Sequence, residues 1–542
     1  MITFRRFIPG LLIAALVGLL TACGGGPPNV AEATERGILL KSNGTEPKTL
    51  DPQVATGVPE NKIISALFEG LINYHPTDDE TPEPGVAERW EMSEDATEWT
   101  FFLRADARWS NGDPVTAHDF VYSYERMLSP GLGAEYVKML YQMENAEAFN
   151  RGDLSDFSEV GVQASDDRTL HFRLVGPTPF FLTMLQHYSW FPVHPPTIER
   201  WDGRYDRSGQ WTLPGRIVGN GPFVLEEWRP NQYIRVTRSP TYWDHDFVRL
   251  NEIYFFPVED INAEMRMFDS GRLHVTNSVP ANDIPSLRAN RPDVLRIEPY
   301  LGTYFYRFNT TRPPFDDPRV RRALTIAIDR RAIVERVTLG GEIPAYGFVP
   351  PGFADHPPGQ FFEHDPERAR ELLAEAGFPG GRGFPRKFIL FNTHENHRKI
   401  AEAIVAMWNT ELGISMQLEN KEWRVYLEDQ VQLNFDVSRA GWIGDYMDPI
   451  TFLEMWTTGN GNNNTGWSNP EYDALIAQAF RSRTQEEHNA TLRAAEALLM
   501  EDLPIAPIYY YWRVYLIRPE VRNWYPKLTD NRPYKYLYLQ AN

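Results

Sequence analysis

The stretch RAGWIGDYMDP, residues 439–449, sets an arginine and an aspartate six positions apart, with only glycine, alanine, isoleucine and tryptophan between them. Side chains of these two charges usually lie on solvated surfaces, but here a bulky aromatic, Trp442, and two glycines accompany them. A buried charge requires a partner, and arginine can hold a carboxylate through two parallel hydrogen bonds. Arg439 and Asp445 are therefore candidates for binding the two ends of a zwitterionic ligand.

Motifs for catalysis or metal binding are weak. HENH, residues 394–397, spaces two histidines by three positions, whereas a metalloprotease helix needs four, so a histidine at a helix start that serves an anion is favoured over a metal ligand. The chain contains no GxSxG elbow and no phosphate-binding GxxxxGK(S/T) loop, and GLGAE lacks the third glycine of a dinucleotide loop. With 73 acidic residues, pairs of carboxylates arise by chance, so such a pair in the sequence does not indicate a glycosidase. We expect a protein without catalysis, metal or cofactor, and an exported hydrolase stays as an alternative.

The histidines fall where a sheet would place a ligand. Residues 387–393 read as a strand, 399–413 as a helix and 414–420 as a second strand, which predicts a crossover on a parallel sheet. Ligands of such sheets bind beyond the carboxyl ends of the strands, near helix N-termini, where His394 and His397 lie.

Two further segments predict helices opened by an Asp-Pro pair. In residues 365–377, Asp365 caps the helix, Pro366 opens it and Gly377 closes it. Residues 317–337 repeat the device, and their six arginines are expected to form a solvated face. Helical and strand patterns alternate along the chain, which is typical of an α/β protein.

The first residues indicate export. Arg5 and Arg6 precede 16 uncharged residues and then Cys23, a run shorter than the roughly 17–25 residues of a membrane span. A basic start, an apolar middle and a small-residue end are typical of a signal peptide. LTAC, ending at Cys23, resembles the lipobox of bacterial lipoproteins, and the alternative is an ordinary signal peptide with an incidental cysteine. As the only cysteine, it excludes an internal disulfide and cysteine-built metal sites.

The amino-acid composition excludes some classes of binding partner. Without residues 1–22, 52 basic residues stand against 73 acidic ones, a net charge of −21. Such a surface repels nucleic acid. The 42% content of hydrophobic residues indicates a globular chain, and its length indicates roughly three domains.

Ten segments together resemble one family, the extracellular solute-binding proteins of ABC importers, family 5, and within it the oligopeptide-binding proteins. They follow in the family's order: TLDPQVATGVPENKIISALFEGL, PGVAERWE, RWSNGDPVTAHDFVYSYERM, IVGNGPFVLEEW, RSPTYWD, PPFDDPRVRRALTIAIDR, PAYGFVPP, NHRKIAEAIVAMW, FDVSRAGWIGDYMDP and LPIAPIYYYWR. The resemblance covers nearly the whole chain after the signal.

The resemblance implies a two-lobed α/β periplasmic-binding-protein fold that closes by hinge motion, with three domains, one of them discontinuous. The expected segments are a lipoprotein signal peptide at 1–22, lobe 1 at 23–68, 196–300 and 513–542, an inserted domain at 69–195, and lobe 2 at 301–512. Hinges are expected near PYLGTYF and YYYWR, and the protein is expected to act as a monomer.

It also implies roles for site residues. Asp445 would bind a peptide ammonium and Arg439 the carboxylate of short peptides, while His397 would meet that of longer ones. The stretch formed by Ala440, Gly441, Trp442 and Ile443 would run extended beside the peptide and offer backbone groups, as would Val58 on the other side. Tyr136 matches a pocket aromatic. The alternatives are a capping Asp445, a structural ion pair of Arg439, and plain packing for Trp442, His397 and Tyr136.

The chain departs from close relatives at a few positions. Gly302 and Ile443 stand where some relatives carry a disulfide, Gln430 where an arginine is common, and Arg307 where a glutamate is. By the resemblance Arg307 and Gln430 line the pocket, so Arg307 is expected to favour acidic peptides or else to pair with a local acid.

The sequence thus predicts a lipid-anchored receptor in the periplasm or on the cell surface, which binds short peptides and delivers them to an ABC permease. Alternatives are a same-fold receptor for a metal chelate or an oligosaccharide, and a peptide-sensing receptor or chaperone.

Overall fold

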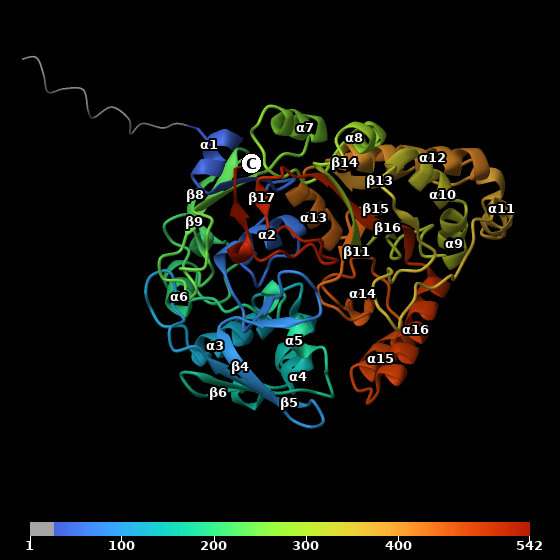
Figure 1. Cartoon of the computed structure of the whole chain (residues 1–542). Coiled ribbons are helices and arrows are strands. Elements are labelled where there is room, and N and C mark those ends of the chain that lie inside the picture. The colour runs from blue at the N-terminus through green and yellow to red at the C-terminus, as the bar shows by residue number, and fades with distance from the viewer. Residues whose placement is uncertain (1–25, 542) are drawn as a thin grey trace, which may run out of the picture.

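The computed structural model describes residues 26–541, so the predicted signal segment and Cys23 lie outside the described residues. Two lobes are visible in Figure 1, with the C-terminal strands close to helix α1 (Val30–Glu35). One lobe carries two four-stranded sheets and two small two-stranded ones, and the other is built around a six-stranded sheet. The α/β content and the two-lobed shape agree with the expected fold class.

The first lobe joins segments that are far apart in sequence. Its upper sheet joins one early strand to three strands that come about 200 residues later, in the spatial order β1 (Ile38–Ser42), β10 (Glu252–Phe256), β9 (Tyr233–Arg238) and β8 (Phe223–Arg229). β1 pairs in parallel with β10, and the two further pairs in this sheet are antiparallel. A second, antiparallel sheet lies at the bottom of Figure 1 beside α3 (Ala117–Leu128): β4 (Ala87–Met92), β5 (Glu98–Leu103), β7 (Thr169–Arg173) and β6 (Val162–Asp166). The domain boundaries given above stay predictions.

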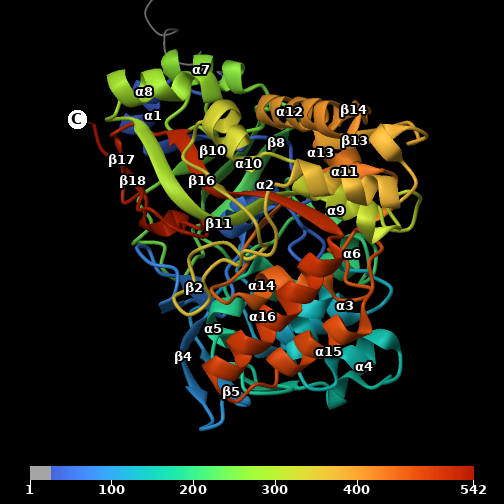
Figure 2. The ribbon, with the colours of Figure 1, turned by 90° about the vertical axis from the view of Figure 1, so that its right-hand side faces the viewer.

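The second lobe is organised by a mixed six-stranded sheet. Its strands, in spatial order, are β12 (Ile343–Pro344), β16 (Ile505–Leu516), β11 (Leu295–Phe308), β15 (Val437–Ile443), β13 (Lys387–Asn392) and β14 (Met416–Lys421). The predicted crossover is confirmed, because β13 and β14 are parallel and α12 (Glu395–Leu412) connects them. Ile400, Ile404 and Trp408 of α12 are fully buried, and Figure 2 shows this helix beside the two strands.

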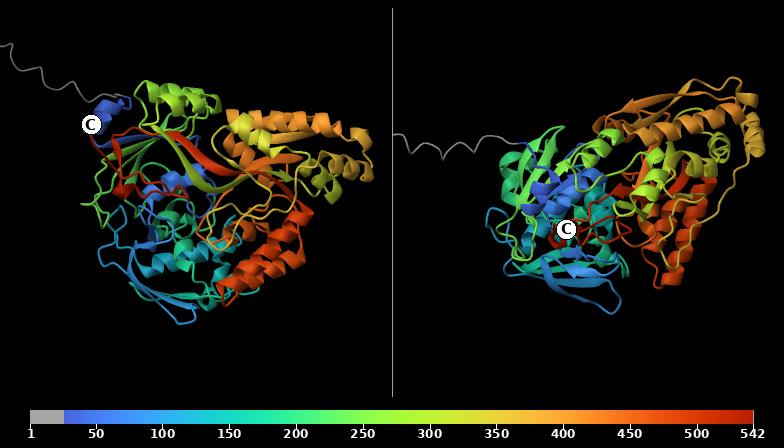
Figure 3. Two further views of the ribbon diagram at one scale, coloured as in Figure 1. Left: turned by 45° about the vertical axis from the view of Figure 1, so that its right-hand side comes forward. Right: turned by 45° about the horizontal axis from the view of Figure 1, so that its top comes forward.

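Two long strands connect the lobes. β11 and β16 pair antiparallel from Leu295 opposite Leu516 to Arg307 opposite Ile505, and both cross the middle of the molecule in Figure 3. Their register shifts between Pro299 and Thr303, within the segment predicted as a hinge. A register shift leaves backbone groups locally unpaired, and the paired ends on either side belong to different lobes.

The helices opened by Asp-Pro pairs form, with one correction. Asp365 caps α11 (Pro366–Glu375) as predicted, while the segment 317–337 divides into α9 (Pro318–Ile326), α10 (Arg330–Ile333) and a π-turn. The expectation that its arginines are all solvated is wrong for two of them. Arg321 is 4% exposed and Arg330 is 0% exposed. Both donate to backbone carbonyl groups, Arg321 to Asp502 at the end of α16 (Gln485–Asp502) and Arg330 to Pro507 of β16. The last carbonyls of a helix lack intrahelical donors, so Asp502 can accept from the buried guanidinium of Arg321.

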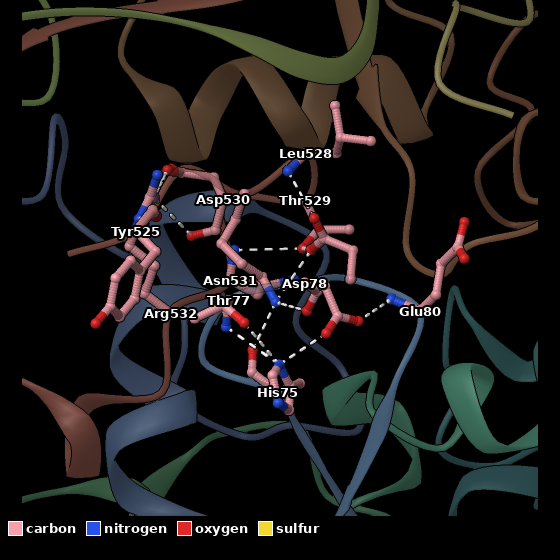
Figure 4. A network of polar contacts seen from close by, with 12 residues as sticks. His75, Thr77, Asp78, Glu80, Tyr525, Leu528, Thr529, Asp530, Asn531 and Arg532 are labelled. Atoms are coloured by element: carbon pink, nitrogen blue, oxygen red, sulfur yellow. Dashed lines mark hydrogen bonds and ion pairs between the residues drawn. The ribbon is translucent and has the colours of Figure 1, made fainter. Parts of the chain in front are cut away.

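The C-terminal segment is fastened inside lobe 1. Lys527 donates to the carbonyl of His75 at 2.7 Å, and the backbone N–H of Leu528 donates to the Asp79 carboxylate at 2.7 Å. Figure 4 shows residues 525–532 beside the loop that carries His75 and Asp78. These contacts fix Asp530 and Asn531 at the inner wall of the lobe, where they face the central cavity.

Candidate functional site

A cavity of about 360 Å³ lies between the lobes and is lined by residues of both. It contains eight of the ten candidate site residues: Val58, Tyr136, His397, Arg439, Gly441, Trp442, Ile443 and Asp445. Ala440 is buried and, like Arg307, is not part of the lining. The structure thus brings together most of the residues that the sequence singled out, from segments almost 400 positions apart.

Strand β15 offers an unpaired edge to this cavity. On one side it pairs with β11 along its whole length, but on the other its ladder with β13 covers only Val437 and Ser438. From Ala440 to Ile443 that second edge has no strand partner in the described chain, whereas the Arg439 carbonyl accepts from the Tyr426 hydroxyl and from Gln430 Nε2. Free backbone N–H and C=O groups in a row are what an extended peptide needs to add a strand. Gly441 leaves room for Tyr511, because a Cβ at this position would lie 2.5 Å from the Tyr511 hydroxyl oxygen.

Asp445 is a buried carboxylate without a cation. Its side chain is 10% exposed, and its neighbours are the Tyr136 hydroxyl at 3.3 Å and His187 Nε2 at 3.4 Å. Burial and the nearby Glu454 raise the pKa of Asp445 well above its usual range. No lysine or arginine of residues 26–541 forms an ion pair with it. A carboxylate held in this way is ready for an ammonium group that arrives with a ligand.

His187 is a site residue that the sequence did not reveal. Burial lowers its pKa to about 3, so the ring is neutral near neutral pH. The Ser189 N–H donates to His187 Nδ1, which leaves Nε2 as the ring nitrogen that donates toward Asp445. The surrounding LQHYSW carries no motif that could have identified it. Only the fold brings this loop of the first lobe against the second lobe.

Arg439 is the complementary buried cation. It is 8% exposed, its Nη1 donates to Asn392 Oδ1 at 3.1 Å, and its Nη2 donates to the Tyr511 hydroxyl at 2.8 Å. Its guanidinium lies over the Tyr304 ring at 4.8 Å from the ring centroid, and its Nε has no hydrogen-bond partner. No carboxylate of the described residues pairs with it. The predicted alternative of a structural ion pair therefore finds no partner there.

The two histidines of HENH lie beside Arg439. His394 caps α12 by accepting the Asn396 N–H, and the pKa of His394 is lowered to about 4 by burial and by Arg439. His397 lies 3.5 Å from the Tyr304 hydroxyl, and the same two causes hold the pKa of His397 well below its usual value. Both rings are therefore neutral hydrogen-bonding groups and not cations. Within residues 26–541, no group of three or more His, Cys, Asp or Glu side chains is placed to hold a metal ion.

The structure places two of the predicted site residues, Val58 and Arg307, differently from the expectation. Val58 was expected to run extended beside the ligand, but it is the first residue of α2 (Val58–Leu67), because Pro59 favours the first turn of a helix. Arg307 does not reach the cavity. Its Nη1 donates to Gln430 Oε1 at 3.3 Å and its Nη2 donates to the Asn462 carbonyl at 3.1 Å, so the two departures from the family pattern contact each other.

The lobes are in contact across the cavity mouth. Tyr136 of the first lobe donates to Asp445 of the second, and Lys138 donates to Thr457 Oγ1 at 3.2 Å. Phe180 stacks on Tyr446 with ring centroids 5.9 Å apart. The described chain is therefore in a closed arrangement.

No helix within residues 26–541 has the length and apolar character needed to cross a membrane.

Known proteins share this architecture. The periplasmic oligopeptide-binding protein OppA of Escherichia coli (strain K12) is 36% identical over 548 residues, which cover 99% of each chain. The crystal structure of Haemophilus influenzae OppA in complex with the peptide RPPGFSPFR matches with a TM-score of 0.88 and 33% identity, over 93% of this chain and 99% of that one.

A third comparison bears on the arrangement of the lobes. A structure of the Escherichia coli murein tripeptide binding protein MppA is 37% identical and covers 93% of this chain and 98% of that one, with a TM-score of 0.88. An unliganded open form of MppA covers the same shares with a TM-score of only 0.62. The lower score agrees with the closed contacts described above. Residues 81–464 match the family described as bacterial extracellular solute-binding proteins, family 5 Middle. This chain therefore belongs to the bacterial extracellular solute-binding proteins of family 5.

Proposed function

We propose that this protein binds short peptides with free termini between its two lobes. The observation that carries the proposal is the pair of buried, opposite and unpaired charges on one cavity, Asp445 and Arg439. Each is costly to bury alone, and a zwitterion supplies the missing partner of each. The free edge of β15 adds hydrogen bonds to a peptide backbone, which do not depend on side-chain identity. Relatives named for oligopeptides and murein peptides support the same substrate class.

The alternatives fit these charges less well. An oligosaccharide has no ammonium for Asp445, and a metal chelate leaves the free strand edge without a purpose. Hydrolysis is disfavoured, because the family comprises binding proteins. A receptor that senses peptides without transporting them would use the same binding site. It would differ from a transport receptor only in the protein to which it passes the signal or the peptide.

Native mass spectrometry of the purified protein tests the substrate class. We expect peptides of a narrow length range to co-purify and to dissociate on mild denaturation. Added free-ended peptides should bind and stay intact over prolonged incubation. Co-purification of a sugar or a metal complex, or sustained hydrolysis that tracks with the pure protein, would contradict the proposal.

The second part of the proposal concerns the place of action. We infer that the protein is exported, is anchored through a lipid on Cys23 and delivers its peptides to an ABC permease. The inference rests on the segment before Cys23 and on relatives that are named periplasmic. A Cys23→Ser variant should move from the membrane fraction to the soluble extracytoplasmic fraction. Full retention of that variant in the membrane fraction would argue against the anchor.

A further inference from the structure

A second cavity of about 50 Å³ lies behind the peptide cavity, inside lobe 1. Three residues line both cavities: Lys62 of α2, and Asp530 and Asn531 of the C-terminal segment. Lys41 of β1 lines the smaller cavity and is 7% exposed. These residues form the wall between the two cavities. The contacts of residues 525–532 with the loop of His75 and Asp78, shown in Figure 4, hold Asp530 and Asn531 in that wall.

Positive charge exceeds negative charge at this wall. Asp530 pairs with Arg513 at 3.2 Å and also with Arg532, whose Nη2 lies 3.0 Å from Glu298 Oε2. Although burial opposes its ionisation, Arg513 and Arg532 hold the pKa of Asp530 below its usual range. The two carboxylates are thus engaged by the two arginines. Lys41 and Lys62 are left as additional cations around the same aspartate.

Neither lysine has an acidic partner. Lys62 Nζ donates to Asn277 Oδ1 at 2.6 Å, which uses one of its three donor hydrogens, and no ion pair of Lys62 or Lys41 exists among residues 26–541. Glu264, the other acid whose charge acts on Lys62, lines neither cavity and accepts hydrogen bonds from Asn277 N and Ser278 Oγ. Burial, reinforced by Arg513, lowers the pKa of Lys62 to about 8, and the charges of Asp530 and Glu264 only partly oppose this shift.

Among the charged residues that line the peptide cavity, Lys62 is the one whose charge has no partner when a free-ended peptide is bound. Six charged residues line it: Lys62, Arg439, Arg513, Glu342, Asp445 and Asp530. Arg513 and Asp530 neutralise each other, and a free-ended peptide matches Asp445 and Arg439. Of the remaining two, Glu342 accepts from Thr338 Oγ1 at 2.7 Å and from the Gly340 N–H at 2.9 Å. Lys62 alone keeps unused charge-bearing donors that face the cavity.

We propose that Lys62, supported by Lys41 and Asn531, forms an anion subsite that accepts a carboxylate in the wall of the peptide cavity. The carboxylate can come from an acidic side chain of the bound peptide or from a free small anion. The inference rests on the proposed peptide binding and names a substrate class within it, peptides that carry Asp or Glu. An ammonium-carboxylate contact in a cavity shielded from bulk water is stronger than on a solvated surface.

Isothermal titration calorimetry with isosteric peptides tests the first source. The set consists of Ala-Ala-Ala and of the three tripeptides with one Glu among alanines, each compared with its Gln counterpart. At one position Glu should bind about tenfold more tightly than Gln, the effect of one charge-assisted hydrogen bond. Lys62→Gln should abolish this ratio and leave the affinity for Ala-Ala-Ala within about threefold, whereas Lys62→Arg should retain the ratio. Lys399→Gln, which removes a lysine outside the cavity, controls for net charge.

The second source is tested without peptide. Sodium acetate, compared with sodium chloride at equal ionic strength, should raise the melting temperature of the unmodified protein and not of Lys62→Gln if the subsite takes a free anion. Failure to bind any free-ended tripeptide would overturn the proposed function, while the acetate measurement would still test the subsite. Normal binding of Ala-Ala-Ala with a Glu to Gln ratio near one at every position, and no acetate effect, would overturn the subsite.

Discussion

Asp445→Asn should weaken binding of free-ended peptides by about 2–5 kcal/mol, because the peptide ammonium then enters a buried site without an opposite charge. Asparagine keeps the shape of the side chain and can still interact with Tyr136 and His187, so the loss isolates the charge. N-acetylated peptides should bind poorly to the unmodified protein and lose little further affinity on Asp445→Asn. Calorimetry on the four combinations measures the coupling directly.

The Asp445 carboxyl gives peptide binding to the unmodified protein a proton signature, which Asp445→Asn should lose. Burial, with Glu454, raises the pKa of Asp445 in the empty cavity, and an ammonium beside the carboxylate lowers that pKa in the complex. Between the two values the empty protein holds a proton that the complex does not. Peptide binding should therefore release protons in this window, and affinity should rise with pH until the pKa of the empty state is passed. Calorimetry in buffers of different ionisation enthalpy measures the release.

Glu454→Gln is the matched control. Burial raises the pKa of Glu454 to about 7, but this carboxylate accepts from the Tyr446 hydroxyl and does not line the cavity. The Glu454→Gln variant should bind peptides with an affinity within about an order of magnitude of the unmodified protein. This loss is much smaller than the one expected when the peptide ammonium has no opposite charge. Equal binding of acetylated and free peptides, or an equal loss at Glu454→Gln, would remove Asp445 from ammonium recognition.

The crossover and the site strand were predictable because their signals are local. Ile400, Ile404 and Trp408 recur at helical spacing between two apolar runs, and the structure buries all three. The two charged residues Arg439 and Asp445, separated by an aromatic residue and two glycines, could be recognised within a stretch of eleven residues. Both side chains proved to be buried on one cavity without opposite charges among the described residues.

The missed features depend on distant contacts. His187 meets Asp445 across 258 positions of sequence, and Lys62 lines the same cavities as Asp530 across 468, separations that no periodicity reports. Arg330 looked like a surface residue because its segment is rich in arginine, yet its buried guanidinium donates to the carbonyl of Ile328 in its own segment and to that of Pro507 in β16. Arg307 was expected at the pocket from the family pattern alone. The structure pairs it with Gln430, which stands at the other altered position.

Arg439→Met should produce the second large loss, again about 2–5 kcal/mol, for peptides whose carboxylate reaches this guanidinium. The substitution removes the charge and all donors while filling a similar volume, and it strands the Asn392 amide oxygen that Arg439 now satisfies. Peptides with an amidated C-terminus should bind weakly to the unmodified protein and change little on Arg439→Met. A length series from two to five residues locates the length at which the loss is largest.

His397 makes the length series informative. Burial and Arg439 keep its ring neutral, so it offers a carboxylate one ordinary hydrogen bond, whereas Arg439 offers a charge-assisted pair. His397→Phe should therefore cost less than Arg439→Met at every length and should matter most for longer peptides. Removing Arg439 should also raise the pKa of His394 and His397, because that cation is one of the causes that lower them, and NMR titration of the ring signals would detect the rise.

Arg307→Met provides the matched control for Arg439→Met. Both arginines are buried, both are replaced by the same side chain, and only Arg439 lines the cavity. Arg307→Met should lower the melting temperature, because the Asn462 carbonyl and Gln430 lose their donor, and should leave the ratio of free-acid to amide affinity unchanged. A ratio that falls equally in both variants would show that loss of buried charge, and not contact with the peptide carboxylate, explains the effect. A ratio that falls only in Arg439→Met assigns carboxylate recognition to Arg439.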